Sequence, residues 1–158
     1  MLNDLPLDIQ TLRTAYASGT APTDIVEEVY RRIKALNDPG IFLLLRDETD
    51  VLEEAHALSS EASPDTPLWG LPFAIKDNID AGDLMRSTAG SLSLMESRPA
   101  GDAHVVALLR AGLRGPKLLR MLFVFTAMGP CGALLGLGLQ RKFGAVFGGA
   151  LDGALIAL

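Results

Sequence analysis

Apolar residues recur at spacings of three and four in four stretches of the chain, and this spacing predicts four amphipathic helices. The helices are expected over residues 8–17, 22–36, 49–60 and 102–111. In the second helix Ile25, Val26, Val29 and Ile33 form the apolar stripe, and Pro22 suits the first turn. Helical periodicity therefore extends through most of the first 113 residues.

Polar residues at the ends of these stretches indicate where the helices begin. Asp50 and Glu53 have the spacing of a capping box, and Asp102 is placed to cap the last helix. The adjacent acids Glu27 and Glu28 are expected on a solvated helix face.

Two short apolar runs predict strands. Residues 41–45 (IFLLL) follow a turn and are expected to form a buried strand. Residues 71–75 (LPFAI) are expected to form a second strand, and Pro72 limits them to an edge or to the first residues of that strand. Residues 76–101 show no period and predict a long irregular segment, a type of segment that is often functional. Together these elements predict an α/β fold with helices packed on a partial mixed sheet.

The chain changes character after residue 113. Residues 1–113 carry 18 acidic residues and 9 lysines or arginines, whereas residues 114–158 carry one acidic residue and five basic ones. The second part is apolar and rich in glycine, and we expect it to be a divergent, helical tail that packs poorly against the first part. Two segments follow from this: a domain over 1–113 and a tail over 114–158.

Residues 121–140 contain no charged side chain, and twenty apolar residues are enough to span a membrane. Gly129 and Pro130 interrupt the run, so a buried core segment is the competing interpretation. Membrane contact of the tail is therefore one of two interpretations that the sequence leaves open.

Composition excludes several other classes of function. The net charge of −5 argues against a nucleic acid partner, because neutralising phosphates needs a basic surface. Cys131 is the single cysteine and is expected to be inert in its apolar run. His56 and His104 lack the spaced partners of a metal site and are expected at the surface. The N-terminus lacks the pattern of a secretory leader, so we expect a cytoplasmic protein.

The strongest chemical signal is Lys76, which ends the apolar run of residues 70–75 and precedes the polar turn Asp77-Asn78. Burial of an ammonium lowers its pKa and can yield a neutral amine that accepts a proton from a hydroxyl. A lysine at a strand end can also simply extend to solvent. The residues around Lys76 decide between these interpretations.

The sequence Gly70–Asp80 (GLPFAIKDNID) resembles the lysine motif of the amidase signature family. Residues 8–19 and 25–33 resemble the opening helical pair of allophanate hydrolases within that family. Residues 87–89 (STA) and 102–112 (DAHVVALLRAG) match the family pattern as well. The resemblance covers about residues 5–112, and the lysine motif is its most specific part.

The resemblance implies a hydrolase that cleaves amide C–N bonds with a serine nucleophile, a second serine in a cis peptide and a lysine. Lys76 would be the general base, acting through the bridging serine, and backbone N–H groups would stabilise the oxyanion. The implied substrate is a small amide or a urea-derived compound such as allophanate, as in urea degradation. Neither a metal nor an organic cofactor is implied, and the oligomeric state is left open.

Neither catalytic serine can be assigned in this chain. The family places its bridging serine in a loop rich in glycine and serine, and the nearest counterpart, residues 148–153 (GGALDG), has no serine. We therefore expect a truncated, inactive amidase fragment. The alternative, from another class, is a non-catalytic protein with a soluble helical head and a membrane-associated tail.

Overall fold

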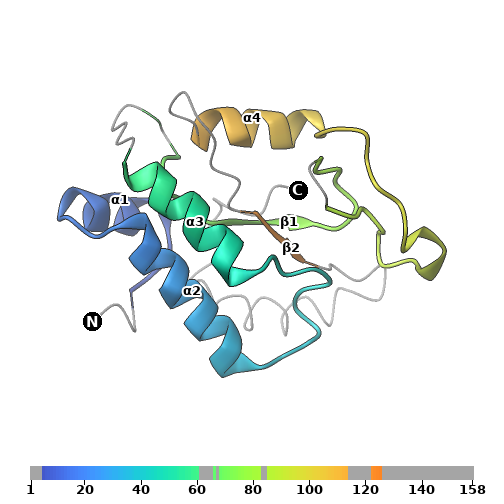
Figure 1. Ribbon diagram of the computed structural model, residues 1–158, viewed down its shortest axis with the longest axis horizontal. Coiled ribbons are helices and arrows are strands. Elements are labelled where there is room, and N and C mark those ends of the chain that lie inside the picture. The colour runs from blue at the N-terminus through green and yellow to red at the C-terminus, as the bar shows by residue number, and fades with distance from the viewer. Residues whose placement is uncertain (1–4, 61–65, 67, 83–84, 114–121, 126–158) are drawn as a thin grey trace.

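The computed structural model describes residues 5–60, 66, 68–82, 85–113 and 122–125 (Figure 1). Four α-helices lie in these residues, as the periodicity predicts. Their bounds are α1 (Ile9–Ala17), α2 (Pro22–Leu36), α3 (Glu48–Ser59) and α4 (His104–Leu113). Each begins and ends within about two residues of its predicted range.

The helix ends follow local hydrogen bonding. Asp8 caps α1, because its carboxylate accepts from the Thr11 N–H at 2.9 Å. Asp47, and not Asp50, caps α3, because its carboxylate accepts from the Thr49 N–H at 2.9 Å. The predicted cap at Asp50 is therefore wrong: an acceptor stands three residues earlier, and Asp50 lies inside the first turn.

The described strands form a parallel pair, β1 (Phe73–Lys76) and β2 (Leu122–Phe125). Phe73 lies opposite Leu122, and Lys76 lies opposite Phe125. The predicted strand at 71–75 is confirmed with a shift of about two residues. The pairing found here is parallel, and the helix α4 lies in the crossover that a parallel connection requires.

Strand β2 falls inside the segment that was expected to be a helical tail. Residues 122–125 therefore correct that expectation, because they extend the sheet of the first part of the chain. The remainder of 114–158, including Cys131 and most of the uncharged run, lies outside the described residues. Within the described part of the chain, no helix has the length and apolar character needed to cross a membrane.

The strand predicted at 41–45 is absent: in this described segment only Leu44 forms an isolated bridge. Ile41 is buried in the core, whereas Leu43 is 49% exposed. The five apolar residues thus do not share one buried environment. An apolar run becomes a strand only where a partner strand lies beside it.

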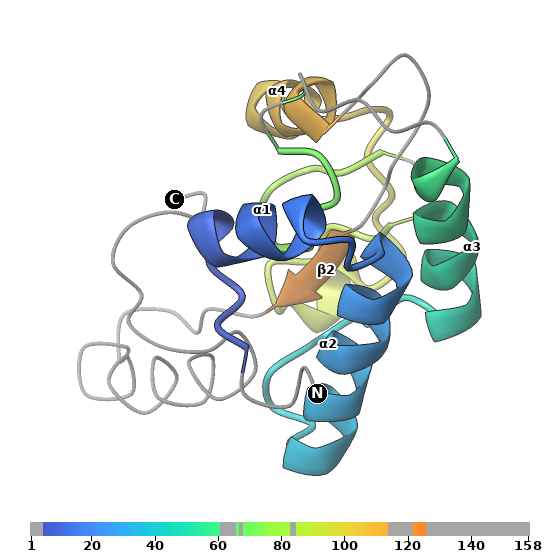
Figure 2. The ribbon, with the colours of Figure 1, turned by 90° about the vertical axis from the view of Figure 1, so that its left-hand side faces the viewer.

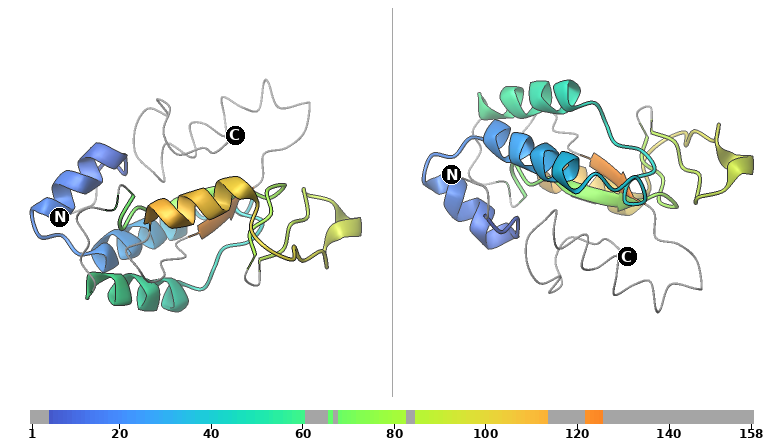
Figure 3. Two further views of the ribbon diagram at one scale, coloured as in Figure 1. Left: turned by 90° about the horizontal axis from the view of Figure 1, so that it is seen from above. Right: turned by 90° about the horizontal axis from the view of Figure 1, so that it is seen from below.

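The core lies between the helices and the strand pair. Figures 1 and 3 show β1 and β2 between α4 on one side and α2 with α3 on the other. Figure 2 shows α1 beside the strands, with α2 and α3 stacked next to it. The most deeply buried side chains come from α1, α2, α3 and the segment that leads into β1. They are Leu12, Ile25, Val26, Val29, Val51, Leu58, Leu71 and Ile75.

One charged group is buried in this layer. Glu28 is 5% exposed and accepts from the Arg32 guanidinium at 2.6 Å, while Arg32 also donates to the Leu5 carbonyl at 2.7 Å. Glu27, its neighbour, is exposed. The expectation of two solvated acids is therefore wrong for Glu28, whose position on the helix turns it toward Arg32.

Candidate active site

Lys76 is the last residue of β1 and is half-buried, after three buried residues, Phe73 to Ile75. Ligands in parallel α/β sheets bind outside the carboxyl ends of the strands, and Lys76 stands at such an end. Among the described residues, its ammonium forms no ion pair, and no hydroxyl is hydrogen-bonded to it. The side chain is thus placed where a reactive amine could serve.

The turn before β1 is held by α1. Gly70 has φ +72°, and a Cβ there would lie 3.0 Å from the Tyr16 ring, so the position suits glycine alone. The Tyr16 hydroxyl donates to the Gly70 carbonyl, and the Tyr16 and Trp69 rings meet edge to face with centroids 5.2 Å apart. Burial raises the pKa of Tyr16, which keeps this donor protonated at neutral pH. The entry to β1 is therefore clamped.

The turn after Lys76 is organised by Asp77, which is 4% exposed. Its Oδ2 accepts from the Thr88 N–H at 3.2 Å, the Gly90 N–H at 3.1 Å and the Thr88 hydroxyl. Its backbone carbonyl accepts from the Ala89 N–H at 3.1 Å. One residue thus ties the distant segment 87–90 to the end of β1, and we call this arrangement the Asp77 latch.

Backbone strain is present inside the Asp77 latch. Ala89 has φ +50°, a conformation that side chains with a Cβ seldom adopt. Such residues persist only where surrounding contacts over-determine them, and they cluster at functional sites. Here the Ala89 N–H is bound to the Asp77 carbonyl, and Gly90 on its other side is bound to the Asp77 carboxylate. The hydrogen bonds of the latch therefore hold the strained residue.

A second carboxylate fastens the irregular segment further along. Asp102 accepts from the Gly82 N–H at 2.8 Å, and its other oxygen lies 2.8 Å from Nε of the buried Arg110. Helix α4 begins two residues later, at His104, so Asp102 links a loop and a helix instead of standing at the cap position. At Gly82 a Cβ would lie 3.1 Å from the Gly101 Cα, so the two backbones are in close contact.

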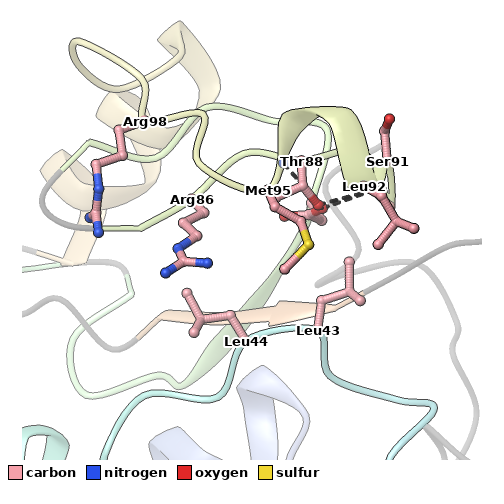
Figure 4. A pocket seen from close by; sticks show the side chains of 10 residues that line it. Leu43, Leu44, Arg86, Thr88, Ser91, Leu92, Met95 and Arg98 are labelled. Atoms are coloured by element: carbon pink, nitrogen blue, oxygen red, sulfur yellow. Dashed lines mark hydrogen bonds between the residues drawn. The ribbon is translucent and has the colours of Figure 1, made fainter.

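A pocket of about 500 Å³ opens beside the Asp77 latch (Figure 4). It is lined by four apolar side chains, two arginines and a group of polar residues from the latch and the η1 turn (Leu92–Leu94). These residues are Leu43, Leu44, Asp77, Arg86, Thr88, Gly90, Ser91, Leu92, Met95 and Arg98. The sequence did not reveal this pocket, because its walls come from segments far apart in the chain; the only signal was the aperiodic segment 76–101.

The remaining candidate residues stay outside this site. His56 and His104 are exposed, as predicted, and the described residues contain no cluster of histidine, cysteine or acidic side chains that could hold a metal. Ser91 and Ser93 are hydrogen-bonded to each other at 2.8 Å, and Ser87 donates to the Asp77 carbonyl at 3.4 Å. These described hydroxyls therefore have structural partners.

Comparison with known proteins identifies the same region. The sequence profile of the Amidase family matches residues 24–112. A glutamyl-tRNA(Gln) amidotransferase from Exiguobacterium sp. is 42% identical in one of its subunits over 89 residues, which are 55% of this chain and 18% of that protein. A putative amidase from Arthroderma benhamiae is 36% identical over 108 residues, which are 65% of this chain and 18% of that protein. The chain thus spans about a fifth of the length of the curated relatives it matches.

Two solved structures resemble the fold. The peptide amidase of Stenotrophomonas maltophilia superposes with a TM-score of 0.58 at 30% identity, over 75% of this chain and 24% of that one. The allophanate hydrolase of Kluyveromyces lactis superposes with a TM-score of 0.53 at 27% identity, over 75% of this chain and 18% of that one. The resemblance predicted from the lysine motif and the helical pair is confirmed.

Proposed function

The chain belongs to the amidase family, and from this premise we propose that it forms the lysine-bearing part of an amidase-type hydrolase. The observation that carries the proposal is the position of Lys76 at the carboxyl end of β1, inside the family's motif and next to the Asp77 latch. The clamped turns on either side of β1 orient this one side chain, and a general base needs a defined position before it needs a suitable pKa.

In the proposed reaction the Lys76 amine accepts a proton through a bridging serine, and the nucleophilic serine attacks the amide carbon. The C–N bond then breaks, the amine leaves with a proton, and water releases the acyl group. Residues 1–158 supply the lysine to this scheme. We propose a small amide or a urea-derived amide such as allophanate as the substrate, in keeping with the similarity to allophanate hydrolase.

We further propose that the 158-residue chain has no amidase activity by itself. A base contributes only where a hydroxyl lies within hydrogen-bond reach, and the described hydroxyls are bound elsewhere. The test is ammonia release from allophanate and simple amides by the purified chain. Turnover that disappears in Lys76→Ala would contradict this proposal, since it would reveal a substitute nucleophile.

The role of Lys76 itself can be tested only beside the two catalytic serines, so we propose a chimaera. Residues 9–125 would replace the aligned segment of the S. maltophilia peptide amidase, and ammonia release from a peptide amide would be measured. We expect an active chimaera, and a loss of roughly 10⁴-fold or more in kcat for Lys76→Ala, because catalytic groups that act as a unit fail together.

Lys34→Ala is the matched control for the chimaera. Lys34 lies on α2, its side chain is 66% exposed, and it is paired with Glu48 at the surface. Removing it should change kcat by less than about twofold, because exposed ion pairs contribute little. An active Lys76→Ala chimaera would disprove the general-base role.

A further inference from the structure

The pocket beside the Asp77 latch has the size and lining of a ligand site, and no role in amide cleavage accounts for it. Its volume of about 500 Å³ lies within the range of small-molecule sites. Such sites combine apolar walls with a few directed polar groups, and here the polar groups include two guanidinium groups. We propose that this pocket binds a small carboxylate that carries a short apolar chain.

The anion-binding wall is formed by Arg86 and Arg98. Figure 4 shows the Arg86 side chain directed toward Leu44, with Arg98 on one side of it and Met95 on the other. The guanidinium of Arg86 is paired only loosely with Glu96, at 3.6 Å, and the Glu96 side chain is 80% exposed. A pair of this kind contributes little, so a ligand carboxylate can displace Glu96. The planar guanidinium matches a carboxylate with two parallel hydrogen bonds.

The acidic groups at the pocket set the charge of the ligand. Asp77 lines the pocket, but its Oδ2 is satisfied by the donors of the latch, and Glu96 stands beside Arg86. Two positive and two negative side chains thus meet here. A carboxylate with one charge can exchange with Glu96, whereas a phosphate ester with two charges is repelled by Asp77.

The opposite wall selects the body of the ligand. Leu43 and Leu44 form one side, and Leu92 and Met95 of the η1 turn form the other (Figure 4). Leu43, Leu92 and Met95 are 49%, 83% and 47% exposed. Covering large apolar side chains is favourable at roughly 25 cal/mol per Å². A chain of three or four carbons attached to the carboxylate would cover them.

The test is direct binding to the full 158-residue chain, followed by calorimetry and by the Nε–H signals of the arginines in NMR spectra. The probes are butyrate, the neutral butyramide and the dianionic butyl phosphate. We expect butyrate to bind with a Kd on the order of 1 mM. Butyramide and butyl phosphate should each bind at least about tenfold more weakly, and butyrate should shift the Arg86 signal.

Three variants sharpen the test. Arg86→Gln should weaken butyrate binding about tenfold, because a charged hydrogen bond is lost. Glu96→Gln should tighten it about twofold, because Arg86 loses its competitor. Arg13→Gln removes a charge from the exposed face of α1 and should leave binding unchanged. All three positions are partly or fully exposed, so folding is not at stake.

Absence of butyrate binding, equal binding of butyrate and butyramide, or unchanged binding in Arg86→Gln would overturn the proposal. Tighter binding of butyl phosphate than of butyrate would overturn the assignment to a monoanion. Binding is measured without turnover, so failure here leaves the proposed role of Lys76 untouched, and an inactive Lys76 leaves this site untouched.

Discussion

The helical layer α1–α3 and the connecting segment, residues 77–103, are stabilised in different ways. The helical layer buries apolar side chains such as Val26, Val51 and Leu58, which are at most 2% exposed. The connecting segment leaves Leu92, Leu94 and Met95 exposed and is held by hydrogen bonds to Asp77 and Asp102. Apolar burial is distributed over many atoms, whereas the connecting segment depends on a few oxygens.

This difference assigns separate tasks to the two regions. The helical layer gives β1 a rigid support, and the connecting segment shapes the surroundings of Lys76 and the pocket. Sites are often built on loops that a scaffold positions. Substitutions in the first region should therefore affect global stability, and substitutions in the second should affect local structure.

The largest effect is expected from Leu58→Ala in α3. Leu58 is 2% exposed, and truncating a buried leucine removes apolar contacts and leaves a cavity, at about 3–5 kcal/mol of unfolding free energy. Denaturant unfolding followed by circular dichroism measures it. Leu92→Ala, at a residue that is 83% exposed, is the control and should change stability by less than about 0.5 kcal/mol. Equal losses at the two positions would refute the contrast in burial.

Glu28→Gln should cost about 3 kcal/mol, since it removes one partner of a buried ion pair with Arg32. The Arg31 guanidinium, bound to Glu28, holds the pKa of this carboxyl below its usual range. A lowered pKa in the folded state means that the stabilisation is present above the unfolded-state pKa of about 4.3 and is lost as pH falls below it.

Unfolding free energies at pH 7 and pH 3.5 measure this dependence. The gap between wild type and Glu28→Gln should narrow at the lower pH. Glu27→Gln changes the neighbouring exposed acid and should show neither the loss nor the pH dependence. A gap that is constant with pH would argue that packing, and not charge, is responsible.

Asp77→Ala should cost about 2 kcal/mol, because the N–H groups of Thr88 and Gly90 lose their acceptor. The effect should be local: hydrogen exchange should accelerate at Thr88 and Gly90 and stay unchanged in α2. Asn78→Ala, at the exposed neighbour, is the control. Uniform acceleration across the helices would show that the latch supports the whole fold and not only the connecting segment.

The sequence determined the four helices, because helical periodicity depends on neighbours within one or two turns of the same chain. It also determined the strand that ends at Lys76 and the resemblance to amidases, since both rest on contiguous residues. The helix caps were less well determined: Asp47 and Asp50 both offered a carboxylate, and only the folded backbone decided for Asp47.

The tertiary structure decided what depends on distant partners. Residues 41–45 are apolar enough for a strand but have no continuous ladder, whereas residues 122–125, predicted as tail, pair with β1. The burial of Glu28 required Arg32 and Leu5 around it. The pocket required folding to bring Leu43 and Leu44 to the η1 turn. Hydrophobic pattern specifies which residues leave water, but the residues that meet there are set by how the chain closes on itself.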